Sequence, residues 1–371
     1  MKKASLLFLG CLFISSCVDR ISIQVPDSYI SQLVVDGVIT DEPGPYTVRL
    51  TKATRIEKFL QFHREFISGA RVIISDNVGN SELLTETDPG VYQTKTNGIQ
   101  GVIGREYSLQ IQTEEGKVYE SEPDKMYPVG ELDSLYYELE TVQPIDKPTQ
   151  YGFRVFVDAQ GAPNRDNLLR WKFTGVFEIN THPELFGLVI SFVEPPECQR
   201  GILPCYFEGP GGTCACCKCW VSRYEVKPHL NDNQFVANGK FRKVEVGYVP
   251  LEYFPFQFKY RFEVKQMSLS PTAFAYWKIV KSQKEGTGSL FQPPTGKSRT
   301  NIFEKEGGES VEGIFYASAT KTKQVYLTNS DVLSTWRGLI VPRWDCEIGT
   351  IAEDCRKAFR FSTTTKPPDW K

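Results

Sequence analysis

Residues 254–265 read FPFQFKYRFEVK, and this stretch decides the fold class. Apolar residues occupy every even-numbered position from Phe254 to Val264, and the intervening positions from Gln257 onward are polar or charged. Alternation with a period of two puts the two kinds of side chain on opposite faces of a β-strand. We therefore predict a long strand over residues 254–264, with one face in a core and the other in water. Aromatic rows can also stack on bases or sugars, but we favour a sheet core.

The same alternation recurs along the chain, between clusters of Gly, Pro, Asn and Asp that indicate turns. It predicts strands over residues 33–39, 46–50, 71–75, 107–111, 151–157, 171–179 and 311–319. Aromatic residues make up 13% of the chain, including 24 Phe and 17 Tyr, and they favour sheets. The sequence therefore predicts a mainly β protein.

One segment carries the signals of an α-helix. Ser270 is a good N-cap, and Pro271 is tolerated at the first helical position. Apolar residues within 273–280 recur at helical spacing, and Gly286 follows the pattern. We predict a helix over residues 271–284 that packs against the sheet.

The chain is too long for one typical domain, so we expect two. Residues 31–126 predict a β-sandwich of the immunoglobulin type, and their order of strands and turns resembles a transthyretin-like module. A Tyr-Pro-Val-Gly junction at 127–130 then leads to a larger β-rich domain, residues 131–371. That domain contains the predicted helix and a Cys-rich loop at 195–220.

The amino terminus carries the pattern of a lipoprotein signal peptide. Two lysines and an apolar run precede Ile14-Ser15-Ser16-Cys17, an arrangement typical of a bacterial lipobox. We expect residues 1–16 to be removed, Cys17 to be lipidated with fatty-acyl chains such as palmitate, and residues 17–30 to form a tether. The protein would then contact the membrane through Cys17. The alternative is an ordinary secretory signal, with Cys17 as a structural thiol.

Charge and short motifs exclude several classes of function. A formal net charge of −2 gives no basic patch for nucleic acid or for anionic lipid. The glycine-rich run 209–212 lacks the Gly-Lys-Ser/Thr of a phosphate-binding loop. The chain has only three histidines, and none lies in a metalloprotease motif. We therefore expect no cofactor, no nucleic-acid partner and no catalytic residues.

Eight cysteines remain after Cys11 leaves with the signal and Cys17 takes the lipid. An even number in an exported chain favours disulfides, and the candidates are Cys198, Cys205, Cys214, Cys216, Cys217, Cys219, Cys346 and Cys355. Local pairing predicts Cys198 with Cys205 and Cys346 with Cys355, and different partners for the adjacent Cys216 and Cys217. The spacing within 214–219 also fits thiolate binding of a soft metal, which is the less favoured alternative.

A series of short motifs in the expected order resembles the domain-of-unknown-function family 4249. The motifs are LVVDGVIT (33–40), GPYTVRL (44–50), CW (219–220), VKQMSLS (264–270), YW (276–277), SLF (289–291), GIFYAS (313–318) and PPDW (367–370). This resemblance implies an exported cell-envelope lipoprotein of Bacteroidota with no established catalytic residues, and we expect it to be non-enzymatic and anchored in the outer membrane. The resemblance also implies a role as an accessory to a TonB-dependent receptor in nutrient uptake.

Two alternatives to this function stay open at the level of sequence. One is an envelope hydrolase with a site near residues 195–220, in which His229 or nearby acids would act. The other is a metal-binding module built on the cysteine cluster. The sequence does not identify a ligand.

Overall fold

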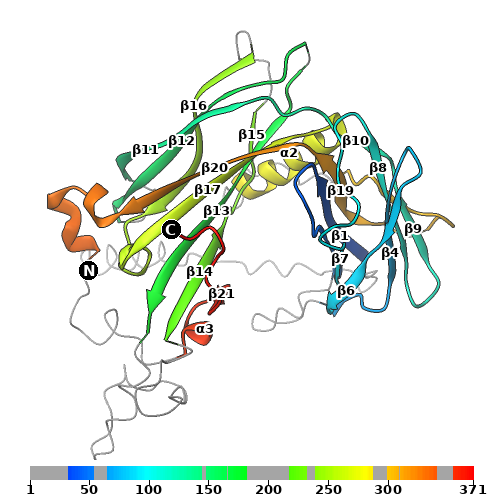
Figure 1. Cartoon of the computed structure of the whole chain (residues 1–371), viewed down its shortest axis with the longest axis horizontal. Coiled ribbons are helices and arrows are strands. Elements are labelled where there is room, and N and C mark those ends of the chain that lie inside the picture. The colour runs from blue at the N-terminus through cyan, green and yellow to red at the C-terminus, as the bar shows by residue number, and fades with distance from the viewer. Residues whose placement is uncertain are drawn as a thin grey trace, which may run out of the picture.

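The computed structural model describes residues 32–53, 65–143, 148–164, 166–181, 217–231, 239–286, 299–308, 310–340 and 354–371. The predicted signal peptide 1–16, Cys17, the tether 17–30 and most of the predicted loop 195–220 lie outside these residues. The described part of the chain forms four β-sheets, here named A to D, so the mainly β prediction is confirmed (Figure 1).

Sheets A and B face each other in a sandwich (Figure 1). Sheet A has the order β19 (Glu312–Ser318), β1 (Gln32–Thr40), β2 (Thr47–Ala53), β7 (Val91–Gln93) and β6 (Thr85–Asp88), with β3 (Glu65–Phe66) paired to β2. Sheet B has the order β18 (Ile302–Glu304), β9 (Val118–Ser121), β8 (Glu106–Gln112), β4 (Arg71–Asp76) and β5 (Ser81–Leu83), with β10 (Asp124–Lys125) paired to β8.

Sheets C and D form the larger part of the molecule. Sheet C has the order β11 (Leu132–Val142), β12 (Gln150–Gln160) and β16 (Lys240–Pro250). Sheet D has the order β20 (Thr320–Thr328), β17 (Lys259–Ser268), β13 (Leu169–Asn180), β14 (Lys218–Tyr224) and β21 (Ser362–Thr363), with β15 (His229–Asn231) paired to β13. Buried residues of all four sheets belong to one connected apolar core.

The division predicted at residues 127–130 is not a division between sheets. Strand β19 pairs in parallel with β1, and β18 pairs with β9, so two strands of the expected domain 131–371 complete the sandwich expected from residues 31–126. Local alternation identifies a strand, but it does not identify a pairing partner almost 280 residues away.

The predicted strand 254–264 begins later than the alternation does. Strand β17 starts at Lys259, and Phe254–Phe256 forms the 3₁₀-helix η6 instead. Pro255 has no backbone N–H to give to a ladder, and the N–H of Gln257 bonds the carbonyl of Phe254 at 3.2 Å. The predicted alternation holds from Tyr260 to Val264, but Arg261 on the expected wet face is buried.

The two parts of the molecule share one almost continuous strand. Strand β19 of sheet A ends at Ser318, and β20 of sheet D begins at Thr320. The N–H of Ala319, between them, bonds the hydroxyl of Ser268 at 3.0 Å. Asp124 supports the same passage, because its carboxylate accepts bonds from the N–H of Ala317 at 2.9 Å and from the hydroxyl of Ser270.

The predicted helix is confirmed as α2 (Pro271–Gly286). Ser270 caps it, since its hydroxyl accepts the N–H of Ala273 at 3.1 Å. The helix packs Ala273 and Trp277 against residues of the outer face of sheet A, including Val38 and Tyr316. No helix in the described part of the chain is long and apolar enough to cross a membrane.

The carboxyl-terminal segment crosses the outer face of sheet D. Beyond the short helix α3 (Cys355–Ala358) and β21, Trp370 packs with Val176 and Trp220. Two further 3₁₀-helices, η7 (Asn329–Asp331) and η8 (Ser334–Leu339), follow β20.

Candidate functional site

A buried arginine joins the two parts of the molecule. Arg170 of β13 is 4% exposed. Its Nη1 donates to the Tyr316 hydroxyl of β19 at 3.3 Å, and its Nη2 pairs with the Glu225 carboxylate. The guanidinium carbon lies 3.6 Å from the centre of the Trp277 ring of α2. A buried cation is tolerated only with such partners, so this contact fixes α2 and sheet A against sheet D.

The ionisation states in this contact follow from burial and charge. Burial lowers the pKa of Arg170, but the neighbouring Tyr316 and Glu225 raise it, and the net shift is upward. Burial raises the pKa of Tyr316 to about 12. Arg170 therefore stays cationic and Tyr316 stays a neutral phenol at physiological pH.

Several polar atoms around Arg170 are buried without a hydrogen-bond partner among the described residues. They are Arg170 Nε, Glu225 Oε2, His229 Nδ1 and Trp277 Nε1. Glu225 Oε2 and His229 Nδ1 are 3.9 Å apart, which is too far for a good hydrogen bond. Buried unpaired groups are uncommon in folded proteins and often mark functional positions.

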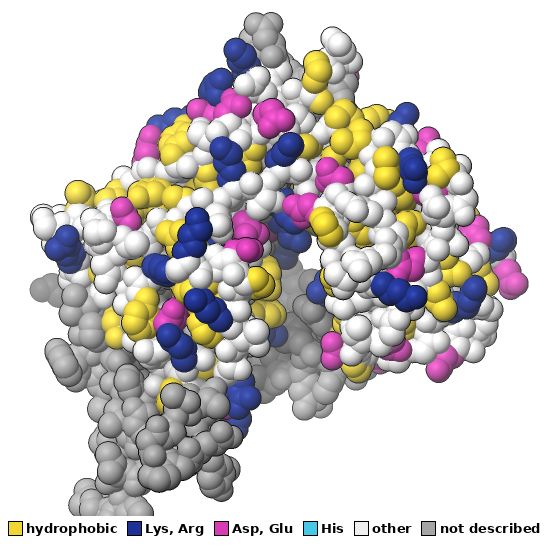
Figure 2. All heavy atoms as spheres, viewed as in Figure 1, with side chains coloured by type: hydrophobic (Ala, Val, Ile, Leu, Met, Phe, Trp, Pro, Cys, Tyr) yellow, Lys and Arg dark blue, Asp and Glu magenta, His cyan; other side chains and the backbone are white. Residues whose placement is uncertain are grey.

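Next to this contact, side chains on the outer faces of sheets D and A are exposed. Arg170 is buried, but Lys172, two residues along the same face of β13, is exposed. On β1, Val38 packs under α2, and Asp36, two residues back on the same face, is exposed. We call the space between these two faces the crevice, and Figure 2 shows the surface hollowed between the two parts of the molecule.

A second polar contact closes the same end of the crevice. Lys265 of β17 pairs with Glu42, which follows β1. The Glu42 carboxylate also accepts the Thr322 hydroxyl at 3.1 Å. Burial raises the pKa of Glu42, but the hydrogen bond and the charge of Lys265 lower it by more than burial raises it, so the net shift is downward.

Lys172 lies at this end of the crevice without an ion-pair partner among the described residues. It is directly opposite Lys265 in the β13–β17 register and on the same face as Arg170. Desolvation by the surrounding protein, and then the charge of Arg170, lower its pKa, while Glu225 and Asp36 raise it less. An exposed side chain that is nevertheless desolvated is expected on the wall of a concave site.

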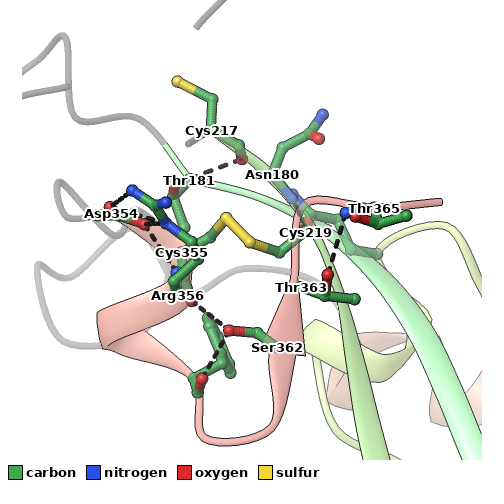
Figure 3. Close-up of a disulfide and its surroundings, with 12 residues drawn as sticks. Asn180, Thr181, Cys217, Cys219, Asp354, Cys355, Arg356, Ser362, Thr363 and Thr365 are labelled. Carbon is green, nitrogen blue, oxygen red and sulfur yellow. Dashed lines mark hydrogen bonds and ion pairs between the residues drawn. A yellow bond between two sulfur atoms is a disulfide. The ribbon is translucent and has the colours of Figure 1, made fainter. Parts of the chain in front are cut away.

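The predicted cysteine sites are only partly within the described residues. Cys219 of β14 bonds Cys355 of α3 at a Cα–Cα distance of 5.9 Å (Figure 3). The predicted Cys346–Cys355 pair is therefore wrong. Cys217 is also disulfide-bonded. Cys198, Cys205, Cys214, Cys216 and Cys346 lie outside the described residues, as does Cys17.

The structure explains why Cys219 takes a distant partner. Strand β21 pairs with β14, with Val221 opposite Ser362, and this brings α3 to the start of β14, where Cys219 lies. Asp354 caps α3 by accepting the N–H of Arg356 at 2.9 Å, and the Ser362 hydroxyl bonds the carbonyl of Cys355 at 3.1 Å (Figure 3). Residues 218–220, predicted as the end of a loop, are in fact the start of β14.

The described residues contain no group of three or more His, Cys, Asp or Glu side chains placed to hold a metal ion. Cys217, Cys219 and Cys355 are oxidised and provide no thiolate ligand. A metal site in the predicted cysteine cluster would need ligands from outside these residues.

Sequence reasoning missed the residues that form the crevice. Arg170 and Lys172 appear in the sequence as part of an ordinary wet face of a strand, and Asp36 as the polar member of an apolar alternation. The Lys172–Lys265 opposition was the available signal, because like charges opposite each other destabilise a sheet. Detecting it requires the strand register.

A family model described as a domain of unknown function, DUF4249, matches residues 18–324. The match includes the crevice and Cys219, and it ends within β20, before Cys355 and Trp370. No curated protein matches the chain.

Proposed function

Because the chain belongs to the DUF4249 family, whose function is unknown, we propose that it is a non-enzymatic lipoprotein of the outer membrane. In this proposal it binds a nutrient in the crevice and acts as an accessory to a TonB-dependent receptor. The lipid on Cys17 would hold the protein at the membrane, on either leaflet.

The observation that carries the proposal is the lipobox Ile14-Ser15-Ser16-Cys17 after a short apolar run. One acyl chain gives only marginal membrane binding, whereas two or more anchor a protein stably, because each buried methylene contributes about 0.8 kcal/mol. A lipoprotein carries at least two acyl chains on its cysteine, so lipidation at the lipobox would be enough to anchor this protein stably.

The geometry of the crevice favours binding. Lys172 and Asp36 are exposed and have no ion-pair partner among the described residues, and the nearby contact of Arg170 holds both walls in place. Fixed polar groups without protein partners, on rigid sheet walls, are what a binding site presents before its ligand arrives.

Neither alternative function gains a specific observation. A hydrolase near residues 195–220 would act mainly through residues outside the described part of the chain. Within it, His229 lies 3.9 Å from Glu225 and beside the Phe173 ring. The metal-binding alternative likewise depends on cysteines outside the described residues, since Cys217 and Cys219 are oxidised.

The anchor is tested by labelling with an alkyne-tagged palmitate. We expect label on the wild type and on Cys11→Ser, and none on Cys17→Ser, which should accumulate with its signal attached. Cys11 is the matched control because it lies in the same signal. Equal labelling of the Cys17→Ser variant would contradict the proposal.

The partnership is tested in cells. We expect wild-type protein to co-purify with an outer-membrane barrel protein, and deletion of the gene to slow growth on one class of nutrient. Cys17→Ser should fail to restore growth, while Cys11→Ser should restore it. Unchanged growth across a broad nutrient panel, together with no captured barrel protein, would refute the accessory role.

A further inference from the structure

The crevice contains two opposite charges that do not pair with each other. Lys172 lies on the wall formed by sheet D, and Asp36 lies on the wall formed by sheet A. Val38, two residues from Asp36, is opposite Tyr316 in the β1–β19 register, and Tyr316 bonds Arg170, two residues from Lys172. Burial and the charge of Arg170 lower the pKa of Lys172, and the charges of Glu225 and Asp36 raise it less. No ion pair within 4.0 Å joins them, and neither has such a partner elsewhere among the described residues.

Neither charge is placed where protein stability alone would favour it. Lys172 has Lys265 directly opposite and Arg170 two residues away on the same face. Arg170 is already paired with Glu225, and Lys265 with Glu42. Lys172 is therefore the unpaired member of three neighbouring cations, an arrangement that destabilises the sheet by repulsion.

Asp36 is in the complementary position. Arg49 is directly opposite it in the β1–β2 register, yet the two side chains form no ion pair. The charge of Asp36 helps to raise the pKa of Tyr276 of α2 to about 12, after burial as the largest cause, so the Tyr276 phenol stays uncharged.

The walls that carry these charges are held rigidly. The Arg170–Tyr316 bond and the Trp277 stack fix the closed end, and the strand β19–β20 runs through both parts. The separation between Lys172 and Asp36 is then set by the fold, so it can select a ligand by the distance between its own charges.

We propose that the crevice binds a molecule that carries both an ammonium and a carboxylate group, such as an amino acid or the two ends of a short peptide. The carboxylate binds Lys172 and the ammonium binds Asp36. This inference rests on the proposed binding function and adds the class of ligand. A purely anionic ligand would leave Asp36 repelling it, and a purely cationic ligand would meet Lys172 in the same way.

The test is calorimetric titration of the full chain with unbranched ω-amino acids of increasing length, from glycine to 8-aminooctanoate. n-Alkylamines and n-alkanoates of equal length are the controls. We expect one length to bind best, about tenfold or more tighter than its singly charged analogues, because each end forms a charge-assisted hydrogen bond. Equal binding of a singly charged analogue, or no binding by any member of the series, would overturn the proposal.

Variants assign the two ends. Lys172→Gln and Asp36→Asn should each weaken the best ligand about 10- to 100-fold. Lys240→Gln should leave binding unchanged, because Lys240 is an exposed strand lysine of sheet C without an ion pair among the described residues. Lys172→Gln should also bind the n-alkylamine better than wild type does, which a merely structural role would not produce. The proposal fails if Lys240→Gln has the same effect as Lys172→Gln.

A second measurement tests whether Lys172 and Asp36 pair with each other instead of with a ligand. Urea unfolding of the two single variants and their double variant, without ligand, should give additive effects. Strong coupling without ligand would show that the residues pair with each other, and would overturn the ligand assignment. These assays use purified protein, so their failure is distinct from failure of lipidation or of uptake in cells.

Discussion

The buried carboxyl group of Asp124 should make the fold less stable as the pH rises towards neutrality. Asp124 is 4% exposed and lies where β10, α2 and β19 meet. Burial raises its pKa from 3.8 to about 6, against the opposing effects of its bonds from the Ser270 hydroxyl and the Ala317 N–H. No cation bonds its carboxylate among the described residues, so hydrogen bonds alone compensate its charge.

The magnitude follows from the two pKa values. In the folded chain Asp124 keeps its proton until about pH 6, whereas in the unfolded chain it releases the proton near pH 3.8. The unfolded state therefore binds fewer protons in this window, and the free energy of unfolding falls as the pH rises. At 1.36 kcal/mol for each pKa unit, this one group removes roughly 3 kcal/mol in total, most of it between about pH 4 and pH 7.

The assay is urea unfolding of the wild type and of Asp124→Asn across this pH range. In the variant, the amide oxygen can accept the Ala317 N–H and the amide nitrogen can donate to Ser270, without titrating. We expect the stability of the wild type relative to the variant to fall by about 2 kcal/mol from pH 4.5 to pH 7. Glu122→Gln, an exposed neighbour, is the matched control. A wild-type-to-variant difference that stays constant within about 0.5 kcal/mol would show that Asp124 titrates normally, and would refute the reasoning.

Three further substitutions test the contacts that define the architecture. Gly313→Ala should cost more than about 3 kcal/mol in unfolding free energy, because the added Cβ would lie 1.9 Å from the Val35 carbonyl oxygen at a φ of +92°. The control Gly307→Ala, at φ +72° with nothing within 4 Å, should cost only about 1–2 kcal/mol. Equal losses in the two variants would count against the tight β1–β19 pairing. Ser270→Ala should cost about 1–2 kcal/mol through the lost helix cap, and more at pH 7 than at pH 5, since ionised Asp124 also loses a donor; a loss independent of pH would argue against that bond. The double variant Cys219→Ala with Cys355→Ala should be less stable than the wild type by about 4 kcal/mol. A reducing agent should destabilise this variant less than it destabilises the wild type. If the variant has the same urea midpoint as the wild type under oxidising conditions, the disulfide is not formed.

Features determined by neighbouring residues were predictable from the sequence. The alternation of 171–179 identifies β13, and Ser270-Pro271 identifies the start of α2 together with its cap. These signals work because side-chain direction repeats every two residues in a strand, and because a helix leaves its first N–H groups open to a cap. The alternation at 254–258 misled because Pro255 opposes a ladder, although the hydrophobic pattern continues through it.

Features determined by long-range contacts were not predictable. Cys355 is nine residues from Cys346 in the sequence, but the β14–β21 pairing places it beside Cys219, 136 residues away. Likewise, nothing local to 312–318 indicates that this strand lies beside β1. The candidate site combines both problems, since Lys172 and Asp36 become notable only when the register of two sheets is known.

The strand shared by the two parts has a mechanical consequence. Strand β1 lies between β2 and β19, so a force applied ahead of Gln32 pulls it lengthwise against both neighbours and loads their hydrogen bonds together in shear. Because β19 runs directly into β20, the tension passes into the second part through a single covalent backbone. A force on the start of β1 is therefore expected to load the hydrogen bonds of sheet A first, and then to reach sheet D through β20.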